Sequence, residues 1–137
     1  RGQQIVVIGD GQMPGPAEDG QDEWRGYAAE RAELASAVGA SPATVIYLNG
    51  DTHSLAYGHS QYGYDRVWQA APLSNETKVK AGGAGYIGQY PTNANEGPVK
   101  QLWAHIQFTD TGSSITATWR GYEGSSVRLQ DSITASG

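Results

Sequence analysis

The chain has 137 residues and a net charge of −5, and it is 38% hydrophobic and 17% charged. This length suits one domain with one hydrophobic core, and the composition excludes an intrinsically disordered chain. The negative charge argues against binding to nucleic acid or to an anionic membrane surface. No apolar run approaches the roughly 20 residues of a transmembrane helix. The absence of cysteine excludes disulfides and thiolate chemistry.

The first element expected is a strand at residues 5–8, where four apolar residues run together before a Gly-Asp-Gly turn. Such a run predicts a strand that is buried on both faces. The polar, acid-rich residues 11–22 predict a long loop, and long loops in compact domains often carry function. Because the chain begins at Arg1 and reaches a strand almost at once, we expect a processed product or one part of a longer polypeptide.

The second element expected is a helix, because apolar side chains recur at helical spacing from residue 24 to residue 38. Its regular part is predicted at residues 27–38 and is closed by Gly39. Arg31 interrupts the apolar stripe. Two interpretations stay open: its head reaches water past a buried stem, or a carboxylate such as Asp22 holds it under the preceding loop.

A second apolar run, residues 45–48, is followed by a turn around Gly50. It predicts another buried strand, which completes a βαβ-like unit with parallel strands. Asp51 and His53 leave the carboxyl end of this strand, where open α/β sheets bind their ligands. Carboxylate and imidazole are both metal-ligand types. From spacing alone, the alternative is that Asp51 caps a turn and His53 is a surface or internally satisfied histidine.

The residues that follow, up to about residue 66, are rich in Gly, Tyr, Ser and Gln and predict a loop before a short apolar stretch at residues 67–71. His59 lies in this loop. We expect it to be exposed to solvent, with metal ligation as the alternative. Residues 74–99 contain many Gly and Pro residues and also predict a loop.

The C-terminal third changes to the alternating period of strands. Residues 102–109 and 115–120 flank a turn at residues 110–113, and residues 127–129 are expected to add a third strand. The result is an antiparallel β-meander with one packed face. His105 falls on the less apolar face, where we expect a surface residue. The many Trp and Tyr residues suggest either stacking on sugars or bases, or simple packing on a half-buried sheet.

Two motifs lie on either side of the predicted helix. The first is Asp22-Glu23-Trp24-Arg25-Gly26-Tyr27 with Arg31, and the second is Gly50-Asp51-Thr52-His53-Ser54 after its apolar strand. In order and separation they resemble the D-x-W-x-G-Y-x-x-x-R and G-D-x-H-S motifs of the alkaline phosphatase D (PhoD-like) family of metallophosphatases. The segment Ala71-Pro72-Leu73 and the meander also look like this family's C-terminal portion.

The resemblance implies an α/β fold that leans toward α+β, namely half of a calcineurin-like metallophosphatase sandwich. It implies a metal-dependent phosphoesterase that acts on a phosphate ester with two divalent or ferric ions, drawn from calcium, iron, zinc or manganese. Asp51 and His53 would be metal ligands and catalytic residues. Asp22 and Tyr27 would lie at the substrate pocket, and the family resemblance favours a secreted or periplasmic location.

The chain departs from the family upstream of these motifs. Related enzymes take most metal ligands from an earlier Asp, a Gly-Asp segment and an Asn, and the pair Gly9-Asp10 matches none of these well. The chain is therefore expected to be a C-terminal half, active only with a second polypeptide or N-terminal fragment that completes the site. The alternative is a non-catalytic structural or interaction module, such as a virion or cell-surface component, that reuses the fold.

Overall fold

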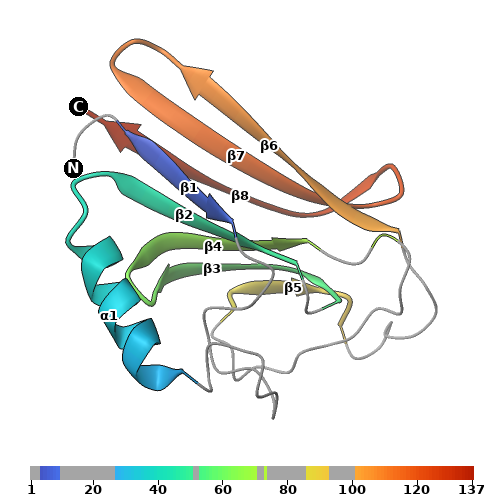
Figure 1. The fold of residues 1–137 in the computed structure, drawn as a ribbon. Helices are drawn as coiled ribbons and strands as arrows, with labels where there is room; N and C mark the ends of the chain where they lie inside the picture. The colour runs from blue at the N-terminus through green and yellow to red at the C-terminus, as the bar shows by residue number, and fades with distance from the viewer. Residues whose placement is uncertain (1–3, 10–26, 51–52, 71–72, 74–85, 93–100) are drawn as a thin grey trace.

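The computed structural model describes residues 4–9, 27–50, 53–70, 73, 86–92 and 101–137. This part of the chain forms one helix layer, a mixed five-stranded sheet of order β1-β2-β4-β3-β5, and an antiparallel three-stranded sheet of order β6-β7-β8 (Figure 1). Within it, no helix is long and apolar enough to span a membrane. The elements are β1 (Ile5–Gly9), α1 (Ala28–Gly39), β2 (Thr44–Asn49), β3 (Leu55–Gln61), β4 (Tyr64–Ala70), β5 (Gly88–Tyr90), β6 (Leu102–Asp110), β7 (Ser114–Glu123) and β8 (Ser126–Ser136).

The N-terminal elements form the predicted βαβ unit, because β1 and β2 pair in parallel on either side of α1 in the sequence. β2 is almost wholly buried, as predicted. The predicted double burial of residues 5–8 is wrong, since Val6 and Val7 are 43% and 41% exposed. The reason is position: β1 is the outer strand of its sheet, and β2 is its one neighbour among the described residues.

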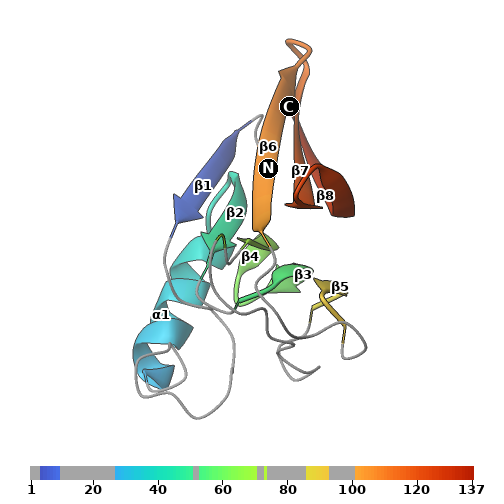
Figure 2. The same cartoon turned by 90° about the vertical axis from the view of Figure 1, so that its right-hand side faces the viewer.

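The helix and the three-stranded sheet cover opposite faces of the mixed sheet (Figure 2). On the helix side, Val38 and Leu34 of α1 pack against Val45, Tyr47 and Val67. The predicted helix at residues 27–38 is therefore confirmed to within one residue at each end. The start of its expected apolar stripe, at residue 24, lies outside the described residues.

The structure contains a hairpin where the sequence predicts a loop. β3 and β4 pair in antiparallel register, and β4 also pairs in parallel with β2. His59 therefore lies on a strand, and the prediction of a loop histidine is wrong. Gly58 and Ser60 are poor strand formers. The pairing of β3 with β4 overrides that preference. β3 covers the edge of β4, whose Val67 and Trp68 are almost fully buried.

The core between the sheets is built around two indoles. Trp68 of β4 and Trp119 of β7 are each 1% exposed, and their rings stack with centroids 6.4 Å apart. The meander is confirmed, and its packed face is the one that covers the mixed sheet. Its third strand, Ser126–Ser136, is much longer than residues 127–129. The predicted turn is also present, with the Gly112 N–H donating to Asp110 Oδ1 at 2.7 Å.

A buried carboxylate on β8 ties the two sheets together. Asp131, whose side chain is 10% exposed, accepts the Trp68 indole N–H at 2.8 Å. Its other oxygen lies 3.0 Å from His59 Nε2. Arg66 Nε forms an ion pair at 3.1 Å with Asp131 Oδ2, the oxygen that accepts from Trp68, although the Arg66 N–H is not aligned for a hydrogen bond. Side chains of β3 and β4 thus surround one acid of the opposite sheet.

A second polar bridge joins β5 to the three-stranded sheet. The Tyr90 hydroxyl donates to Glu123 Oε2 at 2.5 Å, and Arg128 donates to the same oxygen at 2.7 Å. Burial raises the pKa of the Tyr90 phenol, the hydrogen bond to Glu123 and its charge add to the rise, and the charge of Arg128 opposes it. The phenol therefore stays protonated and donating beyond its ordinary range.

Removing the carboxylate of Asp131 should destabilise the fold. In Asp131→Ala the Arg66 charge loses its counter-ion and the Trp68 indole loses its acceptor. We expect the free energy of unfolding in urea to fall by about 3 kcal/mol. The control is Glu33→Ala on the exposed side of α1, with an expected change within about 0.5 kcal/mol. Equal stabilities of the two variants would contradict this account of how the sheets are held.

Gly63 offers a test of the contact between the β3–β4 turn and α1. It has a φ of +84°, and a Cβ at this position would lie 2.2 Å from the Ala35 carbonyl oxygen. Gly112 has a nearly identical φ of +83° with nothing within 4 Å of an added Cβ. We expect Gly63→Ala to destabilise by about 1–3 kcal/mol more than Gly112→Ala, because only the first adds a clash. If both variants lose the same free energy of unfolding in urea, the positive φ and not the clash with Ala35 accounts for the effect.

Candidate functional site

The candidate site lies at the carboxyl end of β2. This strand runs parallel to both β1 and β4, so the three carboxyl ends meet at one edge of the sheet. Such an edge is where open α/β sheets bind ligands. β2 ends at Asn49, and His53 lies in a turn with a φ of 56°, in the left-handed region. A histidine held there is strained by about 1–3 kcal/mol, and strained residues cluster at functional sites.

A buried polar layer lies under this turn. Gln69 of β4 is fully buried and donates to the Ser54 hydroxyl at 2.8 Å and to the Ser54 carbonyl at 3.1 Å. Its carbonyl oxygen accepts from Asn49 Nδ2 at 3.3 Å and from the Tyr86 hydroxyl at 2.5 Å. One amide therefore connects both ends of the turn with β4 and with the segment before β5.

Two polar atoms at this turn are buried and have no hydrogen-bond partner in the part of the chain that the structure describes. They are Asn49 Oδ1 and His53 Nδ1. Leaving such an atom unpaired costs about 1–3 kcal/mol, and folded proteins seldom do so without a reason. An amide oxygen and an imidazole nitrogen are both donor types used for metal ions. Each atom is thus chemically suited to a cation or to a hydrogen-bonding ligand.

The other predicted site residues are only partly placed. Asp51, predicted as catalytic and as a metal ligand, and Asp22, predicted at the substrate pocket, both lie outside the described residues. Tyr27 comes directly before α1 and is 53% exposed, and its carbonyl accepts the Arg31 N–H at 2.9 Å. Its contact with substrate stays a prediction. Among the described residues, no group of three His, Asp or Glu side chains could hold a metal ion.

The position of Arg31 bears on its two interpretations. Its guanidinium lies 5.3 Å from the centroid of the Tyr62 ring, and its Nη1 is buried without a hydrogen-bond partner. The first interpretation requires a guanidinium that reaches water. The buried Nη1 shows that this guanidinium is not fully hydrated. A carboxylate such as Asp22 would supply the missing acceptor, and that pairing stays a prediction.

The remaining histidines have no part in this site. His59 is half-buried against Asp131, so it serves the contact between the sheets rather than metal binding. His105 is exposed on β6, as the sequence predicts.

Sequence reasoning missed most of the polar layer. Gln69 interrupts an otherwise apolar stretch at residues 67–71, which is a signal for a buried, hydrogen-bonded amide. Asn49 ends the apolar run before Gly50 and carries a similar signal. Ser54 and Tyr86 carry none, because their partners are distant in sequence.

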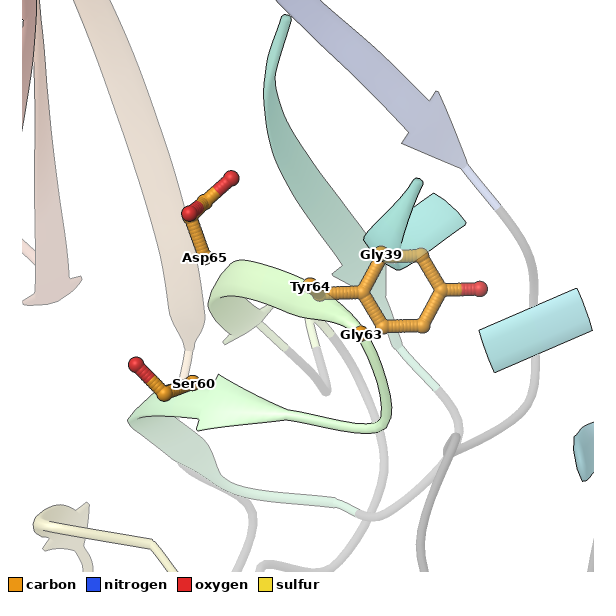
Figure 3. A pocket seen from close by; sticks show the side chains of 5 residues that line it. All are labelled: Gly39, Ser60, Gly63, Tyr64 and Asp65. Atoms are coloured by element: carbon orange, nitrogen blue, oxygen red, sulfur yellow. The ribbon is translucent and has the colours of Figure 1, made fainter. Parts of the chain in front are cut away.

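A separate shallow hollow of about 200 Å³ lies where the end of α1 meets the β3–β4 turn. Figure 3 shows the side chains of Ser60 and Asp65 directed away from the Tyr64 ring. The Asp65 carboxylate accepts the Val45 N–H at 2.8 Å and so serves the packing of β2 and β4. The polar residues that line it are Ser60, Tyr64 and Asp65, and because the Asp65 carboxylate already serves β2 we assign the hollow no function.

Comparison with protein-family models found no matching family, and comparison with curated proteins found no match. The resemblance to PhoD-like metallophosphatases therefore stays a prediction from the sequence motifs.

Replacing Gln69 should test the polar layer. In Gln69→Leu the Asn49 amide, the Ser54 hydroxyl and the Tyr86 hydroxyl all lose a buried partner. We expect the free energy of unfolding to fall by at least about 2 kcal/mol. The control Gln101→Leu changes an exposed amide and should stay within about 0.5 kcal/mol of the native protein. A Gln69→Leu variant as stable as its control would rule out a structural layer here.

Proposed function

We propose that this chain is the C-terminal half of a PhoD-like metal-dependent phosphoesterase and that it contributes Asp51 and His53 to a two-metal site. The observation that carries the proposal is that His53 Nδ1 and Asn49 Oδ1 are both buried without a hydrogen-bond partner among the residues that the structure describes. Both lie at the carboxyl end of a parallel strand, directly around the G-D-x-H-S motif.

The residues of the turn have separable roles in this proposal. Asp51 and His53 would hold the metals, or His53 would donate a hydrogen bond to the phosphate. Bound metal ions in such a centre polarise the phosphoryl group and supply a nucleophile from water at neutral pH. Gln69 and Ser54 would keep the turn in position, because a ligand needs fixed hydrogen-bonded support to keep its geometry. Tyr27 and Asp22 would contact the substrate.

The exposed edge of the mixed sheet supports the need for a second polypeptide or an N-terminal segment. β1 is apolar and parallel, and parallel strands are normally covered on both faces. Val6 and Val7 are instead partly exposed, and so is Phe108, at 51%, on the packed side of the meander. An apolar strand with an open edge is a template for further strands. Added strands here would extend the same sheet that carries the candidate site.

A non-catalytic interaction module is the second candidate. It is favoured by the stacked Trp103 and Tyr122 rings, because Trp103 is exposed and exposed aromatic rings suit binding surfaces. Metal content distinguishes the two functions. The phosphoesterase should bind divalent or ferric ions stoichiometrically once the completing segment is present, whereas the module need not.

His53→Ala tests the phosphoesterase directly. The complex of this chain with its completing segment should lose at least about 100-fold in hydrolysis of p-nitrophenyl phosphate and of bis-p-nitrophenyl phosphate. Its stability should not fall, because His53 Nδ1 has no partner to lose. His105→Ala, at an exposed histidine, is the matched control and should retain full activity. A His53→Ala complex that keeps its activity would contradict the phosphoesterase proposal.

A further inference from the structure

The outer face of the three-stranded sheet is a second candidate surface. No described element covers it (Figures 1 and 2). Because side chains alternate along a strand, this face carries the residues that point away from the Trp68–Trp119 core. The register places them in cross-strand rows: Trp103 opposite Tyr122, His105 opposite Arg120 and Gln130, Gln107 opposite Thr118 and Ser132, and Thr109 opposite Thr116 and Thr134.

An aromatic platform occupies one end of this face. The rings of Trp103 and Tyr122 stack with centroids 4.3 Å apart and planes 9° from parallel. Trp103 is 39% exposed, and its indole N–H donates to the Gly124 carbonyl at 2.7 Å. One face of the indole is thus covered by tyrosine, and the ring is held in place by a hydrogen bond. A fixed, exposed indole needs no further ordering before it binds a flat ligand.

Arg120, which has no counter-ion among the described residues, lies one row from this platform. Arg120 is two residues from Tyr122 on β7, about 7 Å along the strand. Its Nε donates to Gln130 Oε1 at 2.9 Å and its Nη1 to Gln107 Oε1 at 3.4 Å. Amides orient a guanidinium without neutralising it. By contrast, Arg66 and Arg128 each pair with a carboxylate.

We propose that this face binds a glycan chain that carries carboxylates, such as a uronate-containing polysaccharide. A pyranose ring would lie on the exposed face of Trp103, whose amphipathic ring suits a ligand with one apolar face. The carboxylate of a neighbouring sugar would pair with Arg120, since guanidinium and carboxylate match in shape and charge. The Gln, Thr and Ser rows supply hydrogen-bonding groups for hydroxyls. The proposal is independent of the phosphoesterase site, which lies in the other sheet.

Single-stranded nucleic acid is the competing ligand, because it also stacks on aromatic rings and pairs with arginine. Such binding usually needs a basic groove that follows many phosphates. The chain instead has a net charge of −5, and Arg120 is the one arginine in these outer rows. A single arginine suits one carboxylate next to a stacked sugar ring better than it suits a run of phosphates.

The test is calorimetric binding of the whole chain to hexasaccharides of alginate, polygalacturonate, hyaluronan and heparin, with cellohexaose and a 12-nucleotide single-stranded DNA as comparison probes. We expect at least one acidic hexasaccharide to bind more tightly than cellohexaose and the DNA. Trp103→Ala should weaken that binding by at least about tenfold. Arg120→Gln should weaken it to the level of cellohexaose, and it leaves the aromatic platform intact.

The matched control is Phe108→Ala, which removes an exposed aromatic ring from the opposite face of the same strand and should leave binding unchanged. Urea unfolding of each variant separates lost binding from lost folding. The proposal is overturned if none of the four acidic hexasaccharides binds, if DNA binds more tightly, or if a folded Trp103→Ala variant binds as well as the native chain. Loss of binding in Phe108→Ala, or none in Arg120→Gln, would equally overturn the assigned face.

Discussion

The rest of the structure depends on one carboxylate that is buried between the sheets. Asp131 accepts the Trp68 indole N–H and pairs with Arg66, while the Trp68 ring stacks on Trp119 of the opposite sheet. A buried carboxylate is tolerated only when charges and hydrogen bonds compensate its lost hydration. These contacts can all form in one alignment of the sheets and are lost in others. The network therefore sets the position of β4 in the fold.

The position of β4 in turn determines the geometry of the candidate site. Neighbouring residues of a strand point to opposite faces, so Trp68 serves the core between the sheets and Gln69 faces the other way. Gln69 then holds Asn49 and Ser54 at the two ends of the turn that carries His53. One strand thus connects the alignment of the sheets to the chemistry at the carboxyl end of β2.

The two open surfaces of the molecule differ in character. The edge at β1 is apolar, with Val6 and Val7 exposed beside backbone groups that have no strand partner among the described residues. It suits a polypeptide, which can add strands and bury apolar area together. The outer face of the meander is polar apart from the Trp103–Tyr122 platform and the neighbouring Val127. It suits a hydrated polymer, which offers flat rings and hydrogen-bonding groups but little apolar area.

The sequence by itself determined the βαβ unit, the meander and the turn that carries His53 at a strand end, because each follows from the period of nearby apolar residues. Only the tertiary structure decided that β1 is an edge strand, that Gly- and Tyr-rich residues form β3, and that Gln69 supports the turn. It also decided that His59 pairs with Asp131, 72 residues away. These features depend on which strands become neighbours. That choice is made by long-range burial and pairing, which leave no periodic signal in any one segment of the chain.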